Sequence, residues 1–98
     1  MVLEIAEYTA VAGKADEFAA GLARGLQIVQ AARGCEGVEL RRCIEDAHRF
    51  VALIRWATIE DHTVAFRGSP EFQAYRAQIA GLFVDPIVAR HYGPADRA

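Results

Sequence analysis

The chain has 98 residues, of which 53% are hydrophobic and 24% are charged, which is the composition of one globular domain. Its 11 basic and 13 acidic residues are interspersed and give a net charge of −2, which argues against a surface that binds nucleic acid. Its apolar runs are too short to span a membrane, and Glu4 and Glu7 would interrupt a secretory signal, so we expect a cytoplasmic protein.

The chain begins with a predicted strand and a predicted helix. Residues 2–11 alternate in polarity with a period of two, which predicts a strand. Residues 14–33 carry large apolar side chains at helical spacing, which predicts an amphipathic helix. Gly34 fits the position that ends this helix, and Gly21 and Gly25 lie beside its apolar stripe, where they would allow a close approach to a sheet.

A hairpin is predicted next. Residues 38–45 and 49–57 have the composition of two strands, and the polar turn at 46–48 would pair them. Cys35 and Cys43 mark the two ends of the first of these strands, about 26 Å apart in an extended chain. That separation is beyond disulfide reach, so we expect free thiols, as is typical of a reducing compartment.

Two helix starts follow the hairpin. Thr58 and Asp61 have the reciprocal spacing of a capping box, which predicts a short helix over residues 60–66. A Ser-Pro pair then marks the start of a longer helix over residues 70–82, because proline suits the first helical position.

The last predicted element is a strand over residues 84–92, in which Pro86 indicates an edge position or a bulge. The element order βαββαβ predicts an α+β fold, a ferredoxin-like sandwich in which helices cover one face of a four-stranded antiparallel sheet. We expect residues 1–98 to form a single domain, with residues 93–98 as a frayed tail.

The second face of this predicted sheet needs a cover. A chain of this length buries only about 60–65% of its surface on folding, so a partner subunit would add to its core. The third strand is largely apolar on both faces: one carries Phe50, Ala52, Ile54 and Trp56, and the other carries Val51, Leu53, Arg55 and Ala57. We therefore expect a homodimer that packs sheet against sheet.

Four segments of the chain carry a family pattern. They are residues 12–18 (AGKADEF), 33–37 (RGCEG), 56–62 (WATIEDH) and 66–72 (FRGSPEF). Together they resemble the antibiotic biosynthesis monooxygenase domain family, and the resemblance extends over nearly the whole chain. It implies a dimeric α+β barrel in which each subunit holds an apolar pocket between its own sheet and helices.

The pocket would take its walls from the strand face that bears Trp56 and from the later helices. Such walls are mostly aromatic and apolar, so the expected partner is a small, flat, apolar aromatic ligand. The candidate substrate-binding residues are Tyr8, Phe50, Ala52, Ile54, Phe66, Phe72 and Tyr75.

The best-known members of this family are anthrone and quinol oxygenases that use neither a metal nor an organic cofactor. The resemblance therefore implies a cofactor-independent monooxygenase for a small phenolic, quinol or anthrone-like aromatic. In such a reaction a base removes a proton, and the electron-rich anion reacts with molecular oxygen. His62 is the candidate base because an imidazole titrates near neutrality, and Trp56 would stack on the substrate and offer its indole N–H.

Two departures from the family pattern leave the reaction open. Anthrone oxygenases carry an Asn four residues before the strand Trp, where this chain has Ala52, and a Tyr six residues after it, where this chain has His62. The residues that haem-degrading members use are replaced here by Tyr8, Phe66 and Arg76, so we expect no haem. An isomerase or lyase on the same scaffold, or a non-catalytic dimer that binds a small molecule, are the alternatives.

The remaining charged and metal-binding residue types suggest no further site. His48 lies in a turn, His91 in the terminal strand and His62 at a helix start, so their spacing predicts no metal centre. Arg67 and Arg76 are interpreted as surface residues or ion-pair partners.

Overall fold

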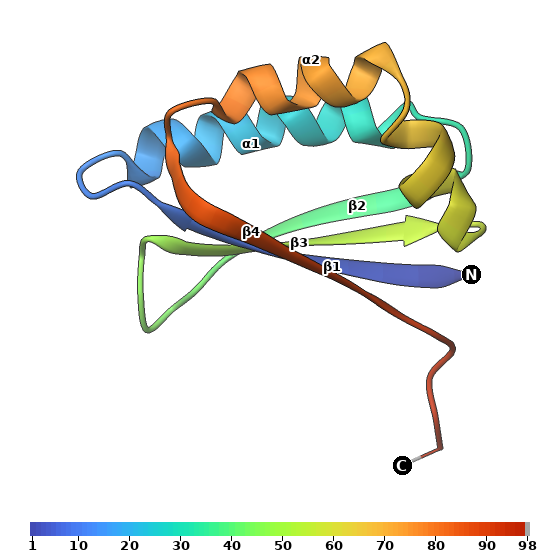
Figure 1. Ribbon diagram of the computed structural model, residues 1–98. Helices are drawn as coiled ribbons and strands as arrows, with labels where there is room; N and C mark the ends of the chain where they lie inside the picture. The colour runs from blue at the N-terminus through green and yellow to red at the C-terminus, as the bar shows by residue number, and fades with distance from the viewer. Residues whose placement is uncertain (98) are drawn as a thin grey trace.

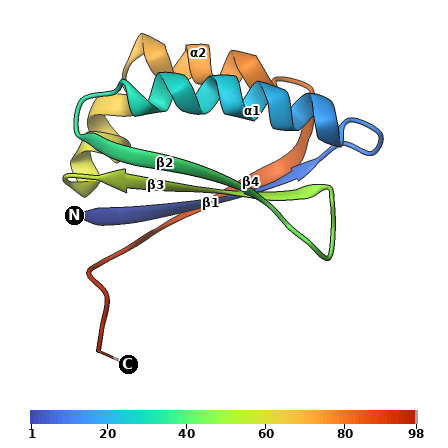
Figure 2. The same cartoon turned by 180° about the vertical axis from the view of Figure 1, so that it is seen from behind.

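The protein folds as one four-stranded antiparallel sheet with its helices on one face, as a computed structural model that describes residues 1–97 shows (Figure 1; Figure 2). The elements are β1 (Val2–Ala10), α1 (Ala15–Gln30), β2 (Cys35–Arg42), β3 (Arg49–Trp56), η1 (Asp61–Phe66), α2 (Pro70–Ile79) and β4 (Phe83–Tyr92). The strand order β2-β3-β1-β4 confirms the predicted α+β, ferredoxin-like arrangement. Within residues 1–97, no helix is both long enough and apolar enough to cross a membrane.

The core lies between the sheet and the two long helices. Alternate residues of β1 and β3 point toward the helices, and the register sets Val2 opposite Trp56 and Tyr8 opposite Phe50. The largest fully buried side chains are Trp56, Phe18, Leu22, Ile79 and Val29. The sheet face that bears Trp56 is therefore the covered face.

The helix α1 ends earlier than predicted, at Gln30, and Ala31 occupies its C-cap position. Gly34 is not the cap but part of the following turn, with φ of +81°, a conformation that favours glycine. A Cβ at Gly34 would also collide with the side chain of Asp61. After this turn β2 begins at Cys35, three residues before the predicted start. The earlier start follows from the hairpin register, in which Cys35 pairs with Trp56.

The predicted capping box is confirmed, but the helix that follows it is not an ordinary one. The Thr58 amide donates to Asp61 Oδ2 over 3.1 Å, and the Asp61 amide donates to Thr58 Oγ1 over 3.2 Å. The Arg67 amide then donates to the His62 carbonyl five residues earlier, as in a π-helix. The segment over residues 61–66 is thus a single wide turn of chain, η1.

The Ser-Pro pair at 69–70 starts α2 as predicted, with Pro70 at the beginning of the helix. The Ser69 hydroxyl does not cap the helix, because it donates backwards to the Phe66 carbonyl over 2.6 Å. The helix ends at Ile79, three residues earlier than predicted, because Ala80 leaves helical dihedral angles and Gly81 follows with φ of +76°.

The terminal strand β4 lies at an edge of the sheet, and its register with β1 shifts between Glu7 and Thr9. Both features were indicated by Pro86. Cys35 and Cys43 are free thiols. Residues 93–97 have no regular structure and lead away from the sheet (Figure 1), while residue 98 of the predicted tail lies outside the described residues.

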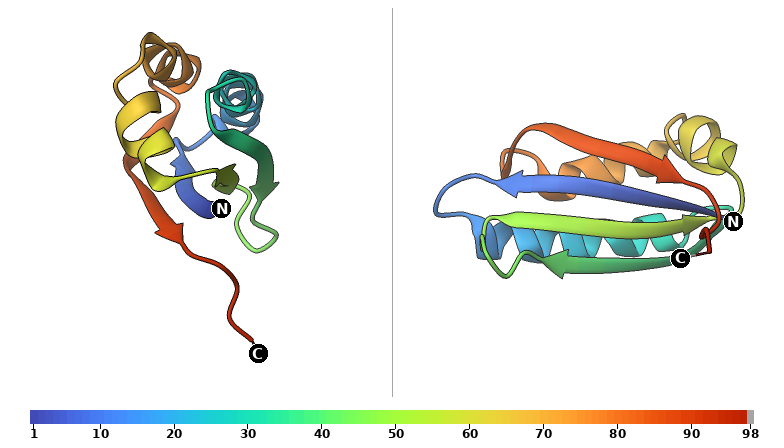
Figure 3. Two further views of the ribbon diagram at one scale, coloured as in Figure 1. Left: turned by 90° about the vertical axis from the view of Figure 1, so that its right-hand side faces the viewer. Right: turned by 90° about the horizontal axis from the view of Figure 1, so that it is seen from below.

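In the described part of the chain, residues 1–97, all helices lie on one face of the sheet, and the outer face carries none (Figure 3). It carries partly buried apolar side chains next to charged ones, which form ion pairs such as Arg90–Glu7 and Arg55–Glu39. The apolar side chains of this face include Leu3, Ile5, Val51, Leu53, Val84 and Val88. The sheet-to-sheet homodimer stays a prediction for this face.

The two glycines of α1 serve a contact different from the predicted one. A Cβ at Gly21 would collide with the Gln78 carbonyl, and a Cβ at Gly25 would lie 3.0 Å from Tyr75 Cδ1. Both partners belong to α2, so the glycines bring two helices together rather than a helix and a sheet. This approach holds α2, and Tyr75 with it, above the sheet.

We expect Gly21→Ala to destabilise the protein by about 1–3 kcal/mol, because overpacking against α2 outweighs the about 1 kcal/mol that alanine gains in helix propensity. Urea denaturation measures the change. Gly93→Ala is the control, since its Cβ would have no neighbour within 4 Å, and its effect should stay within about 0.5 kcal/mol. A Gly21→Ala protein as stable as the wild type would contradict the close approach.

Candidate functional site

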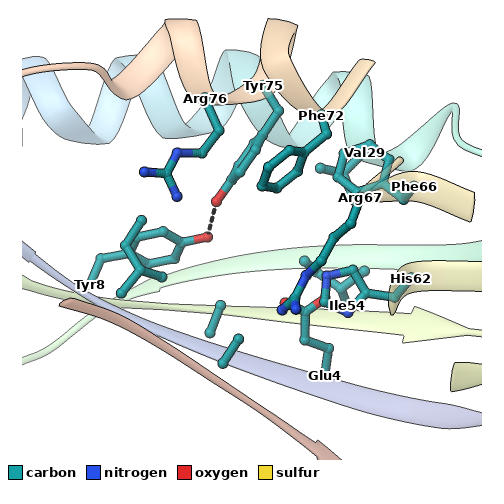
Figure 4. Close-up of a pocket in the computed structure, with 13 residues that line it drawn as sticks. Glu4, Tyr8, Val29, Ile54, His62, Phe66, Arg67, Phe72, Tyr75 and Arg76 are labelled. Carbon is teal, nitrogen blue, oxygen red and sulfur yellow. Dashed lines mark hydrogen bonds and ion pairs between the residues drawn. The ribbon is translucent and has the colours of Figure 1, made fainter. Parts of the chain in front are cut away.

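A cavity of about 250 Å³ lies between the sheet and the later helices (Figure 4). Strands β1, β3 and β4 contribute its floor, and η1 and α2 contribute most of its roof. It is lined by Glu4, Ala6, Tyr8, Val29, Ile54, His62, Phe66, Arg67, Phe72, Tyr75, Arg76, Ile87 and Ala89.

Most of the predicted site residues line this cavity, but three do not. Tyr8, Ile54, His62, Phe66, Phe72 and Tyr75 are part of its wall. Phe50 instead packs against Phe18, with ring centroids 5.0 Å apart, and beneath the Arg42 guanidinium. Ala52 and Trp56 are fully buried. These residues share the strand face of Ile54, as predicted, yet the cavity opens toward β1 and β4 and reaches β3 only at Ile54.

Trp56 lies behind the wall and supports it. Its ring stacks on that of His62, with centroids 5.2 Å apart and planes inclined by 15°. Its indole N–H donates to Glu4 Oε1 over 2.9 Å. Both Glu4 and His62 are only 4% exposed. Trp56 therefore orients the imidazole and the carboxyl group that face the cavity.

His91 completes this group of residues. Its Nε2 lies 2.7 Å from His62 Nδ1, a hydrogen bond between two imidazole rings. The same Nδ1 of His62 lies 3.5 Å from Glu4 Oε1. We call Glu4, Trp56, His62 and His91 the His62 cluster.

Strand register and the wide turn η1 bring the His62 cluster together. In the sheet, Glu4 pairs with His91 on one side and with Ile54, two residues before Trp56, on the other. The turn η1 then places His62 over Trp56. The sequence interpretation missed Glu4 and His91. A signal for Glu4 was present, because the period of two that places Tyr8 on the covered face places Glu4 there as well.

Burial sets the charge state of the cluster. Burial, together with the positive charges of Arg67 and His91, lowers the pKa of His62 to about 4. Burial also raises the pKa of Glu4, against which the Trp56 hydrogen bond and the charge of Arg67 act. At neutral pH His62 is thus an uncharged ring beside a carboxyl group, able to accept a proton.

The fold brings His62 and His91 together, although their spacing in the sequence suggested that they lie apart. The oxygen and nitrogen atoms of Glu4, His62 and His91 that could bind a metal ion lie within 4.8 Å of one another. Two nitrogens that each lie about 2.0–2.1 Å from a tetrahedral zinc ion are about 3.3 Å apart. The observed 2.7 Å between the two imidazole nitrogens instead fits a hydrogen bond, so we interpret His62 and His91 as a hydrogen-bonded pair.

The opposite end of the cavity offers hydrogen-bond donors. The hydroxyls of Tyr8 and Tyr75 lie 2.6 Å apart, and Arg76 lies beside them (Figure 4). Burial raises the pKa of both phenols, so they keep their protons at neutral pH. One hydroxyl donates to the other, which leaves one O–H for a ligand. Arg67 is exposed and Arg76 is partly buried, in keeping with the predicted surface positions, but both also line the cavity, which is more polar than expected.

Comparison with known proteins gives consistent matches. The model of the family described as antibiotic biosynthesis monooxygenase matches residues 1–78. The uncharacterized protein YczJ of Bacillus subtilis is 30% identical over 92 residues, which cover 94% of this chain and 97% of YczJ. A structure from Bordetella bronchiseptica, described as a candidate antibiotic biosynthesis monooxygenase, is 34% identical and superposes with a TM-score of 0.90, covering 96% of each chain.

SnoaB of Streptomyces nogalater, described as a cofactor-independent oxygenase, shares the fold at lower identity. Its structure superposes with a TM-score of 0.82 at 17% identity, covering 98% of this chain and 94% of SnoaB.

The buried neutral state of His62 makes stability depend on pH. The pKa of His62 is about 4 in the folded protein, against an ordinary value of 6.5, so the unfolded chain binds this proton first. The contribution is fully present above pH 6.5 and is lost as the pH falls toward 4, by about 3 kcal/mol in total. His62→Gln should therefore flatten the pH dependence of the free energy of unfolding in this window.

Urea denaturation at a series of pH values measures this effect. Glu4, whose pKa is raised, acts in the opposite sense, but it is present in both proteins and largely cancels in the comparison. His48→Gln, in the exposed turn before β3, should keep the wild-type slope. Identical slopes for His62→Gln and the wild type would show that His62 is not buried as a neutral ring.

Proposed function

The chain belongs to the antibiotic biosynthesis monooxygenase family, and from this premise we propose that it is a cofactor-independent monooxygenase. Its substrate would be a small phenolic, quinol or anthrone-like aromatic, oxidised by molecular oxygen. The observation that carries the proposal is the neutral, buried imidazole of His62 at the cavity wall, held between Trp56 and Glu4. The description of SnoaB as a cofactor-independent oxygenase supports the reaction class.

Triplet oxygen reacts slowly with closed-shell molecules, so the enzyme must first create an electron-rich anion. His62 would accept the proton of an acidic C–H or O–H group. Its Nδ1 is engaged with His91, which leaves Nε2 for the substrate. The Glu4 carboxylate, with its Oε1 3.5 Å from Nδ1, would stabilise the imidazolium that forms.

The anion would then pass one electron to oxygen, and the resulting radical and superoxide would combine through a new C–O bond. The peroxide anion takes back one proton. For an anthrone methylene, the O–O bond then breaks as the second C–H proton leaves, which yields a quinone carbonyl and one water. The cavity walls would exclude water and orient the substrate, because η1 and α2 lie over the cavity and the Phe66 and Phe72 rings line it.

The size and polarity of the cavity narrow the substrate. Small-molecule sites commonly measure about 300–1,000 Å³, and this cavity measures about 250 Å³. Within the proposed substrate class, this volume favours phenols and quinols of one or two rings over a three-ring anthrone. The free hydroxyl of the Tyr8–Tyr75 pair and the Arg76 guanidinium suit a carbonyl or phenolate oxygen. A substrate with its acidic hydrogen at one end and such an oxygen at the other would match both ends.

The proposal also includes a homodimer formed through the outer face of the sheet. The apolar side chains of that face are the support, because a monomer would leave them in contact with water. The cavity lies on the opposite side of the sheet, so pairing would leave it open.

Oxygen consumption tests the reaction directly. Metal-chelated protein is mixed with a panel of naphthohydroquinones, anthrones and simple quinols in an oxygen electrode. We expect uptake above the uncatalysed rate, a fall in kcat of about 10²–10⁴-fold for His62→Ala, and a smaller fall for Trp56→Phe, which keeps a ring but loses the donor to Glu4. His48→Ala should match the wild type.

An absence of oxygen uptake with every panel member would overturn the oxygenase. If such a compound nevertheless exchanges a proton with deuterated solvent in a His62-dependent manner, the protein is an isomerase or lyase. If compounds bind without either reaction, it is a binding protein.

The dimer is tested by size-exclusion chromatography with light scattering at micromolar concentration. We expect the wild type to elute as a dimer and Leu53→Glu to elute as a monomer, because a charge would enter the centre of the paired sheets. Ile44→Glu, at a position that is 95% exposed in the hairpin turn, should stay dimeric. A monomeric wild type would contradict the pairing.

A further inference from the structure

His91 is a second imidazole at the site that the proposed reaction has not yet used. It lies on the edge strand β4, 29 residues beyond His62, and its Nε2 is 2.7 Å from His62 Nδ1. His62 is buried at the cavity wall, whereas His91 is only partly buried. The two rings therefore connect the cavity with the solvent.

A proton that reaches His62 does not stay there easily. The ring is buried, and the charged or titratable groups near it within residues 1–97 are Glu4 on β1, Arg67 after η1 and His91 on β4. Tyr8 on β1 and Tyr75 and Arg76 on α2 line the same cavity. Burial and Arg67 disfavour a positive charge at this position, which the pKa of about 4 reflects. A second group must therefore take up the charge.

Two groups are near enough to do so. Glu4 Oε1 lies 3.5 Å from His62 Nδ1, beyond a good hydrogen bond, and it already accepts the indole N–H of Trp56. His91 Nε2 lies at 2.7 Å, and its ring can be solvated by water when it becomes charged. His91 is therefore the better acceptor by distance and by solvation.

We propose that His62 and His91 form a two-histidine base, in which His91 holds the substrate's proton equivalent while oxygen reacts. The inference rests on the proposed function, since His62 must first take a proton from a substrate. His91 acts through His62 and is a positioning residue for proton transfer. The proposed dimer forms through the outer face of the sheet. It would leave His91 accessible, because His91 lies beside Glu4 on the opposite face, which the helices cover.

The proton balance closes within one turnover. The substrate proton binds His62 Nε2 while the Nδ1 proton moves to His91 Nε2, so His62 stays neutral and His91 carries the charge. When the peroxide anion has formed, the His91 proton returns to Nδ1, and the Nε2 proton passes to the peroxide. Both rings regain their starting tautomers, and no proton is lost to water.

The first test needs no substrate. In EDTA-treated, 15N-labelled protein, we expect ring resonances of both His62 and His91 to shift together during an acid titration, as coupled groups do. In His91→Gln, which retains a polar side chain but cannot carry the positive charge that lowers the pKa of His62, His62 should be protonated at a higher pH. Separate titrations in the wild type, with His62 unchanged in His91→Gln, would overturn the pair.

The second test uses turnover with the best substrate of the panel. His91→Gln should lower kcat by about 10-fold or more and leave KM within about two-fold, and added imidazole should restore rate to His91→Gly. His48→Gln is the matched control. Full kcat in His91→Gln would overturn the inference. If the wild type consumes no oxygen, the proposed function fails, while the ring titration still decides whether the two histidines act as one base.

Discussion

A carboxyl group buried on the covered face of the sheet determines how this site is arranged. Glu4 lies on β1, between β3 and β4, and it is only 4% exposed. Burying such a group is costly unless it has polar partners, so the surroundings must supply them. The indole of Trp56 does so directly, and that hydrogen bond fixes the ring on which His62 stacks.

The rest of the fold keeps this arrangement in place. The capping box of Thr58 and Asp61 turns the chain at the end of β3, and the wide turn η1 then carries His62 back over Trp56. The glycine approach between α1 and α2 fixes the roof that holds Tyr75 against Tyr8. One end of the cavity thus accepts protons and the other donates hydrogen bonds, with an apolar floor between them. This polarity suits an aromatic molecule that must become an anion in a dry space.

The sequence predicted the architecture well because local rules decide it. Alternation of polarity, the capping box and the proline at the start of α2 are short-range features, and the sheet order follows from them. The site was only partly predictable. Phe50 and Ala52 share the strand face of Ile54, but whether a residue reaches the cavity depends on how α1, α2 and η1 sit above it. The 2.7 Å contact of His62 with His91 depends on the pairing of β4 with β1, and spacing along the chain carries no trace of it. Arg67 and Arg76 were predicted as surface residues because arginine usually is one, but their place at the cavity also depends on how η1 and α2 sit above the sheet.

A crystal structure with a bound naphthoquinone would test most directly whether this cavity is the reaction site. We expect the ligand between the His62 cluster and the tyrosine pair, with a reacting carbon about 3–3.5 Å from His62 Nε2. An oxygen of the ligand should accept a hydrogen bond from Tyr8 or Tyr75. A ligand bound elsewhere, with the cavity collapsed around His62, would contradict the site and the chemistry derived from it.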